Sequence, residues 1–308
     1  MVIHDRSYPR WDGDRDKPVR GIWVILDRGV ITGLGQIFKR KLVGQLLSFG
    51  AFGPFLFALG AMYLAFFFQA NADQYGDMAA GMQDSGLVQM ITPYPDTVWG
   101  YYMQIQIWVC LLVSIFVGSA LIAEDRRTNA LEMYLSRPLT VLQYMLGKLS
   151  IIGFFLAIIT VVPVCILILV QSFLSGLEPT EVARLVDLMW RSVLAGGLFV
   201  GMLGLLVLTA SALSNRARNA AILWIGFLFI LEGLVHNLLV EQFLTSNVHL
   251  VSVQFNLGRC MAWILGNEAE LIRYPDLPVM NSAIVLGGWA VLCTTLILRK
   301  VRPVEIVA

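Results

Sequence analysis

Six long apolar runs constrain this chain most, because each is long enough to cross the hydrocarbon core of a membrane. A transmembrane helix needs about 20 consecutive, mostly apolar residues. The runs cover approximately residues 46–68, 101–122, 149–173, 192–213, 220–240 and 279–298. They do not alternate between apolar and polar residues as the strands of a membrane barrel do. The sequence therefore predicts an all-α integral membrane protein with six transmembrane helices.

The composition excludes an ordinary soluble domain. Hydrophobic residues make up 57% of the chain and charged residues only 14%, whereas soluble domains carry roughly 25% charged residues. Pro54 and Pro163 lie inside the first and third runs. Each removes one backbone donor, so we expect a kink in these two helices without loss of the span.

The distribution of Lys and Arg predicts the orientation, because cytoplasmic loops retain positive charge. If both termini are cytoplasmic, 18 of the 22 Lys and Arg residues fall on that side, in segments 1–45, 123–148, 214–219 and 299–308. We therefore expect a protein of the plasma (bacterial inner) membrane with both termini in the cytoplasm. The net charge is only +1, so we interpret the basic residues as membrane anchors that contact lipid and expect no nucleic-acid partner.

The flanking segments complete the predicted organisation of the chain. Residues 1–45 form a cytoplasmic tail that ends in an amphipathic helix lying in the membrane interface, because apolar residues recur there at helical spacing from Trp23 to Phe38. The alternative is a partly disordered tail, since Gly29, Gly33 and Gly35 weaken a helix. Residues 46–298 form the transmembrane domain, and residues 299–308 form a cytoplasmic tail.

Residues 241–278 are too long for a simple turn between the fifth and sixth runs. They include the apolar stretch HLVSVQFNLGRCMAWILG, which Asn256 and Arg259 interrupt. A seventh span would bury Arg259 in the membrane. We therefore interpret this segment as short re-entrant helices that cap the outer face.

The loop between the second and third runs, residues 123–148, combines six charged residues with a proline in AEDRRTNALEMYLSRPL. Its pattern predicts a short helix on the cytoplasmic surface of the membrane. Asn129 can cap its start, and Leu131 and Leu135 lie four residues apart on one face. Pro138 prevents this helix from continuing into the third span.

A second helix follows this proline directly. Thr140 and Gln143 have the spacing of a T-x-x-Q capping box, which predicts a helix start at this point. That helix carries Gly147 and Lys148 to the membrane. The surface helix before Pro138 is held firmly at the membrane, so a cytosolic partner could apply force to it.

At these residues the chain resembles the membrane subunits of ABC-2 type ABC transporters. The family pattern is an acidic residue with Arg, then Gly-Thr-Leu-Glu, Leu-Ser-x-Pro, and Gly-Lys at the third span. Asn129 and Ala130 stand here in place of Gly-Thr, and Arg127 replaces a common second acidic residue. The matching residues are Asp125, Arg126, Leu131, Glu132, Leu135, Ser136, Pro138, Gly147 and Lys148.

This resemblance implies a type V exporter-like membrane domain and a function as the permease subunit of an ATP-driven exporter. Two copies, or one copy with a related permease, would enclose the path as a dimer. Two cytosolic P-loop ATPase subunits would bind ATP and Mg²⁺ beneath residues 123–148. The chain contains no G-x-x-x-x-G-K-[ST] motif, so we expect no cofactor and no enzymatic activity in this chain itself.

Two sets of residues keep alternative interpretations. Arg216 and Arg218, in the turn between the fourth and fifth runs, are either a second ATPase contact or simple positive anchors. The charged loop 123–148 could likewise only retain positive charge on the cytoplasmic side, without contacting an ATPase. Glu232, with His236 one turn further along the fifth run, either lines the path or marks a helix break. An intramembrane acid also leaves open a stand-alone secondary transporter driven by an ion gradient.

Overall fold

The computed structural model describes residues 25–33, 35, 41–71, 106–131, 140–174, 179–235, 238, 246–266 and 277–301. Almost all of these residues are helical, and no strand occurs among them. The expectation of an all-α chain of membrane-spanning character is confirmed at this level.

Five helical stretches in the described residues are long and apolar enough to cross a membrane. They are Gln106–Arg127, Val141–Phe173, Val182–Leu213, Ala217–Leu234 and Val279–Lys300, and they match the second to sixth predicted runs. The first predicted run lies within α2 (Lys41–Ala70), in which the apolar stretch is the shorter Ser48–Leu64. A span through the first run, which would bring the number of spans to six, therefore stays a prediction.

The helices extend beyond the apolar runs that predicted them. The stretch Gln106–Arg127, which matches the second predicted run, ends with α6 (Ala120–Arg127), five residues past the predicted end of that run. Asp125 and Arg126 are therefore helical and not part of a loop. Hydropathy detects only the part of a helix that sits in hydrocarbon, whereas the backbone hydrogen bonds continue into the interface. Arg126 and Arg127 occupy the last turn of α6, where positive charge favours the helix dipole.

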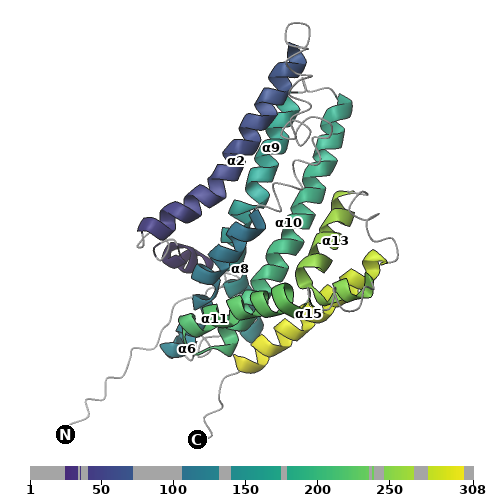
Figure 1. Cartoon of the computed structure of the whole chain (residues 1–308). Helices are drawn as coiled ribbons and strands as arrows, with labels where there is room; N and C mark the ends of the chain where they lie inside the picture. Colours follow the sequence, from purple (N-terminus) through teal and green to yellow (C-terminus); the bar gives the residue numbers. More distant parts are fainter. Residues whose placement is uncertain are drawn as a thin grey trace, which may run out of the picture.

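Helix α10 (Pro179–Leu213) lies at the centre of the bundle and contacts helices on every side. Figure 1 shows α8 and α9 on one side of α10, α13 and α15 on the other, and α2 running along α9. Side chains of α10 such as Ala195, Val207 and Leu208 are fully buried in the apolar core. The surrounding helices are α8 (Val141–Ile159), α9 (Val161–Leu174), α11 (Ala217–Phe227), α13 (Val253–Leu265) and α15 (Val279–Lys300).

The predicted capping box and proline kink are both present in the third span. Thr140 accepts a hydrogen bond from the backbone N–H of Gln143, whose side chain accepts one from the backbone of Thr140, and α8 begins at the next residue. The span is interrupted at Thr160, between α8 and α9. The interruption directly follows Ile159, four residues before Pro163, where the proline ring clashes with a helix carbonyl. Pro54 instead lies inside the unbroken α2.

The N-terminal segment is helical over residues 25–33, as the interfacial-helix interpretation predicts. Its glycines have a role other than the weakening that the sequence suggested. A Cβ atom on Gly29 would overlap the side chain of Ile151, and one on Gly33 would lie 2.8 Å from the ring of Phe155. The two glycines, four residues apart, therefore let this helix approach α8 closely, in the manner of small-residue stripes in membrane helices.

Two segments leave regular α-helical geometry within the membrane-spanning stretches. The stretch Gln106–Arg127 contains the π-helix η1 (Ser114–Gly118), and the stretch Ala217–Leu234 continues from α11 into the π-helix η2 (Leu228–Val235). π-Helical turns are rare and occur frequently at functional sites. The outer segment supplies the 3₁₀ helix η3 (Ser246–Val251) and α13. At about 1.5 Å per residue, α13 is roughly 20 Å long and too short to span a membrane.

Candidate functional site: the α6–α8 cluster and the Glu232 cavity

A buried ion pair joins the two ends of the segment that carries the family resemblance. The ammonium group of Lys148 on α8 lies 2.6 Å from the carboxylate of Asp125 on α6, with side-chain exposures of 8% and 16%. The hydroxyl of Tyr144 donates a 2.7 Å hydrogen bond to the same carboxylate oxygen. The Lys148 ammonium also lies 5.5 Å from the centre of the Tyr144 ring. These three side chains form one compact cluster, which we call the α6–α8 cluster.

Local structure positions this cluster. The capping box at Thr140 determines where α8 begins, so Tyr144 and Lys148 fall four residues apart on one face of the helix. Tyr144 is fully buried. The sequence analysis did not select it, although its place one turn before Lys148 on a helix of known start was a usable signal.

Helix α6 is also bound to the end of α10. The guanidinium of Arg126 donates a 2.5 Å hydrogen bond to the backbone carbonyl of Ala212. The hydroxyl of Ser211 accepts hydrogen bonds from the backbone N–H groups of Ile122 and Ala123, both at 3.0 Å, and donates to the carbonyl of Ser119. Ser211 therefore satisfies donors at the start of α6 from a neighbouring helix. A serine inside an apolar run was too weak a signal to select it beforehand.

Asn129 differs from its predicted role. Its backbone is left-handed, with φ of 55°, whereas an N-cap residue normally has an extended backbone. Its N–H points back to the carbonyl of Arg126 at 3.4 Å. Asn129 therefore ends α6 in the manner of a helix C-terminal residue, and Ala130 and Leu131 are helical after it.

Several predicted site residues lie outside the α6–α8 cluster or outside the described residues. Arg216, in the turn between α10 and α11, and Arg218, in the first turn of α11, are both exposed and close in sequence to the Ala212 carbonyl that Arg126 contacts. Figure 1 shows α6 and the α11 end of this turn at the same end of the molecule. Five predicted site residues lie outside the described residues, namely Glu132, Leu135, Ser136, Pro138 and His236.

Glu232 lies in η2 and holds the N-terminus of α13. One carboxylate oxygen accepts hydrogen bonds from the backbone N–H groups of Val253, at 2.7 Å, and Gln254, at 3.3 Å. The other accepts one from the hydroxyl of Ser252, which in turn accepts from the N–H of Phe255. The first three N–H groups of α13 are thus all satisfied by side chains. These are the contacts that the helix-break interpretation of Glu232 requires.

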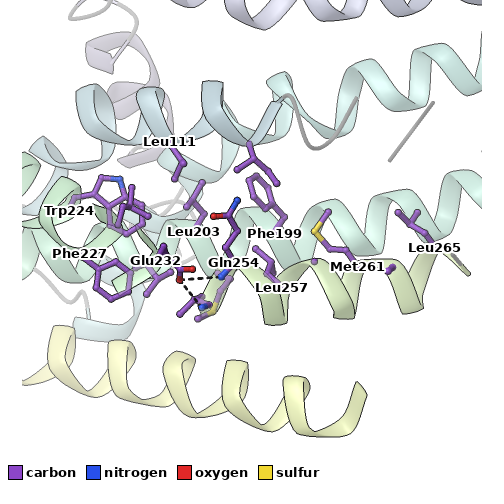
Figure 2. Close-up of a pocket in the computed structure, with 17 residues that line it drawn as sticks. Leu111, Phe199, Leu203, Trp224, Phe227, Glu232, Gln254, Leu257, Met261 and Leu265 are labelled. Atoms are coloured by element: carbon purple, nitrogen blue, oxygen red, sulfur yellow. Dashed lines mark hydrogen bonds between the residues drawn. The ribbon is translucent and has the colours of Figure 1, made fainter. Parts of the chain in front are cut away.

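Glu232 also borders a cavity of about 140 Å³. Figure 2 shows Trp224, Phe227 and Glu232 toward one end of this cavity and Leu265 toward the other. Most of its wall is apolar, and it is formed by the helix that leads into η1 together with α10, α11, η2 and α13. Position beside the cavity is what the path interpretation requires, so the geometry of Glu232 is compatible with both roles.

Arg259 is buried in spite of the short length of α13. Only 4% of this residue is exposed, although we expected a short helix because a longer one would bury it. Its guanidinium donates to the carbonyl of Leu277 and lies 5.8 Å from the centre of the Phe255 ring. Arg259 is therefore buried because α13 packs against α15 and against Leu277 just before it, although α13 is too short to span the membrane.

The four cysteines are all free thiols. In the described part of the chain, no group of three or more His, Cys, Asp or Glu side chains is arranged to hold a metal ion. Compared with known proteins, the chain matches neither a protein-family model nor a curated protein sequence. The family resemblance therefore depends on the motif residues alone.

Proposed function

We propose that this chain is the permease subunit of an ATP-driven ABC-2 type exporter, with six spans in the plasma membrane and both termini in the cytoplasm. Two copies, or one copy and a related permease, form the path as a dimer. Two cytosolic P-loop ATPase subunits bind ATP and Mg²⁺ and act on the segment around residues 123–148. The five apolar helices and the motif residues in that segment support this assignment.

The observation that carries the proposal is the buried pair of Asp125 and Lys148. These residues are the first acidic position and the final Lys of the motif, and the structure brings them to 2.6 Å from each other. Because this ion pair joins α6 to α8, a force applied to the segment between them displaces both helices together.

The contacts of α6 extend the same argument to the centre of the bundle. Arg126 and the backbone of Ile122 and Ala123 are hydrogen-bonded to the last turn of α10. Helix α10 in turn forms part of the cavity wall through Phe199 and Leu203. Movement of α6 is therefore applied to a helix that borders the Glu232 cavity.

Purification from the native membrane tests the proposal. A tagged chain extracted in mild detergent should copurify with a soluble P-loop ATPase, and the reconstituted complex should move cargo only when ATP and Mg²⁺ are present. Glu132→Arg, in the predicted surface helix, is the matched variant that should insert normally but lose transport-coupled ATP hydrolysis. Purified chain that transports in liposomes without ATP and without a copurifying ATPase would overturn the assignment.

A stand-alone secondary transporter is the second candidate, favoured by a carboxylate that lies within a membrane-spanning stretch and borders a cavity. Such a protein would move its substrate in response to an imposed ion gradient. The carboxylate of Glu232 already accepts three hydrogen bonds at the start of α13, so a transported ion would have to compete with these contacts. The same liposomes, with a proton gradient in place of ATP, separate the two candidates.

A further inference from the structure

The third span and helix α10 form an antiparallel hairpin whose register can be followed along its whole length. A Cβ atom on Gly204 of α10 would lie 2.8 Å from the side chain of Leu149 on α8. One on Gly153 of α8 would lie 3.6 Å from the side chain of Val200 on α10. Residues 175–178 join the end of α9 to the start of α10, and this short connection continues the same antiparallel spacing through α9.

Charged residues of α10 lie level with apolar side chains of α9. The spacing places Arg184 level with Leu169, and Arg191 level with Val162. Leu169 and Val162 are 50% and 46% exposed, and α9 contains no charged residue. Figure 1 shows α9 and this end of α10 extending past the ends of α13 and α15. Charges and lipid-facing apolar side chains therefore share one level, at the end of α10 away from the α6–α8 cluster.

The charged residues form one stripe on α10. Arg184, Asp187 and Arg191 have the i, i+3, i+7 spacing of a single helix face, and all three are exposed. Asp187 and Arg191 form a 2.7 Å ion pair in which their side chains remain 59% and 44% exposed. A charged side chain against hydrocarbon is costly, so membrane proteins pair such residues or bring water and lipid headgroups to them. We call these three residues the α10 charged stripe.

A shallow trough continues from the stripe toward the other end of α10. Gly197 and Gly201 lie four residues apart, and a Cβ atom added to either would meet no atom within 4 Å. Leu194, which is 47% exposed, lies between this trough and the stripe. From Arg191 to Gly201 the helix rises roughly 15 Å at about 1.5 Å per residue. One leaflet of a hydrocarbon core about 30 Å thick has the same depth, so the trough fits an extended acyl chain.

We propose that this surface of α10 binds one zwitterionic phospholipid, with its phosphate on Arg191, its ammonium group on Asp187 and one acyl chain over Gly197 and Gly201. The lipid belongs to the leaflet farther from the α6–α8 cluster. The ion pair engages the Nε group of Arg191, and a guanidinium carries four further N–H groups in a planar fork that suits phosphate. The binding needs neither ATP nor an ATPase partner and goes beyond the proposed exporter function.

The order of the charges favours a headgroup that carries both signs. The α10 charged stripe alternates between positive, negative and positive along the helix. A purely anionic headgroup on the arginines would leave the Asp187 carboxylate beside another negative charge, which is unfavourable. An ammonium group next to the phosphate removes this repulsion.

The test is native mass spectrometry of the full chain, titrated in detergent with dioleoyl phosphatidylethanolamine or dioleoyl phosphatidylglycerol. The two lipids share their acyl chains and phosphate, and only phosphatidylethanolamine has an ammonium group. The wild type should bind phosphatidylethanolamine more tightly. Asp187→Asn should weaken phosphatidylethanolamine by about 5-fold and strengthen phosphatidylglycerol. Arg191→Gln should weaken both lipids by about 5-fold, the effect of one charge contact near a membrane surface.

A second set of variants tests the acyl chain. Gly197→Leu fills the trough without a clash, so it should weaken both lipids and leave the ratio of their affinities unchanged. Gly287→Leu on α15 is the matched control, because it makes the same change at another exposed glycine with open space. Arg218→Gln is the matched control for charge removal, because this exposed arginine follows the opposite end of α10. Both controls should bind the two lipids as the wild type does.

Three results would overturn the inference. Unchanged phosphatidylethanolamine affinity in either Asp187→Asn or Arg191→Gln would mean that the headgroup does not lie on the stripe. Unchanged affinity in Gly197→Leu would mean that the acyl chain does not lie in the trough. Tighter binding of phosphatidylglycerol by the wild type would mean that the stripe does not select a zwitterion. All are measured without ATP, so they stand apart from the exporter assignment, which ATP-driven movement of cargo in the reconstituted complex decides.

Discussion

Asp125→Asn removes the negative charge opposite Lys148 and keeps the size of the side chain. The Lys148 ammonium then stays in a site where only 8% of its side chain is exposed. Asparagine can still accept a hydrogen bond from Tyr144 or Lys148, so the substitution tests mainly the charge. We expect the folded protein to insert but to be less stable.

The magnitude follows from the distance and the burial. At 2.6 Å and an effective dielectric constant of about 20, the two charges attract by roughly 6 kcal/mol. Removing both ions from water costs several kcal/mol each, so most of this attraction is offset. Breaking a buried pair by deleting one partner typically costs about 3–5 kcal/mol. Because Asp125 retains 16% exposure, we expect a loss near the lower end, about 3 kcal/mol.

A double-mutant cycle separates the pair from the general effect of each substitution. Lys148→Met keeps much of the apolar stem and should cost about 2 kcal/mol, because the partly exposed Asp125 keeps its hydrogen bond from Tyr144. The double variant has no unpaired buried charge and should also cost only about 2 kcal/mol. The interaction energy is then about 3 kcal/mol, at the upper end for contacting residues.

Unfolding in mixed micelles by titration with dodecyl sulfate, followed by circular dichroism, gives these free energies. Tyr144→Phe is the control, since it removes one hydrogen bond to the carboxylate and leaves both charges in place. If the effects of Asp125→Asn and Lys148→Met add within about 0.5 kcal/mol, as those of independent sites do, then the two residues do not form a coupled buried pair and the reasoning fails.

Three other predictions address the surface helix, the fifth span and the outer thiol. Glu132→Arg should abolish transport-coupled ATP hydrolysis without affecting membrane insertion, and an ATPase rate equal to the wild type would show that the predicted surface helix is not the contact. Glu232→Gln should lower the free energy of unfolding by about 1–2 kcal/mol, because α13 loses an anionic cap; transport that stays normal and keeps its pH dependence would exclude proton handling by this residue. Burial raises the pKa of the Cys260 thiol, and the nearby charge of Arg259 lowers it by less, so the reactive thiolate forms only above the ordinary thiol range. N-ethylmaleimide at pH 7 should therefore label Cys260 much more slowly in the native than in the unfolded protein, and equal labelling rates by mass spectrometry would contradict this burial.

Features that depend on a few neighbouring residues were predictable from the sequence. The capping box at Thr140 and Gln143 needs only a spacing of three residues, and it is present as expected. The break near Pro163 follows from the missing N–H and the ring of the proline. The apolar runs identified the positions of five membrane-length helices, but their ends were misjudged because a helix continues beyond its apolar part.

Features that depend on distant residues were not predictable in this way. Asp125 and Lys148 were each selected from the motif, yet nothing in the spacing indicated that they touch, because the contact depends on how α6 and α8 pack. The role predicted for Asn129 was wrong because asparagine is favoured both at the N-cap of a helix and at the left-handed position that follows a helix. Gly29 and Gly33 illustrate the same limit, because helix propensity does not register a helix that packs against them.

Glu232 was selected from the sequence as a charge in an apolar run, but its geometry depends on the π-helix η2. A π-turn adds one residue per hydrogen-bonded ring, and no residue pattern in LFILEGLV signalled it. The cavity likewise depends on side chains from five elements of the chain.

Helix α13 contacts different helices at its two ends. Its N-terminus is bound by Glu232 of η2, and Gly266, the residue that follows its last residue Leu265, lies beside α10, because an added Cβ there would be 3.2 Å from the guanidinium of Arg191. The guanidinium of Arg191 is paired with Asp187 one turn earlier on α10, so α10 contacts α13 at this end by packing. The Glu232 cavity lies against α10, η2 and α13, so its volume must change whenever α10 shifts relative to η2. Helix α10 is hydrogen-bonded to α6 through Ala212 in its last turn and also forms part of the cavity wall. Helix α11 packs against α6 as well and contributes Trp224 and Phe227 to the same wall, so a force applied at the α6–α8 cluster reaches the cavity through both α10 and α11.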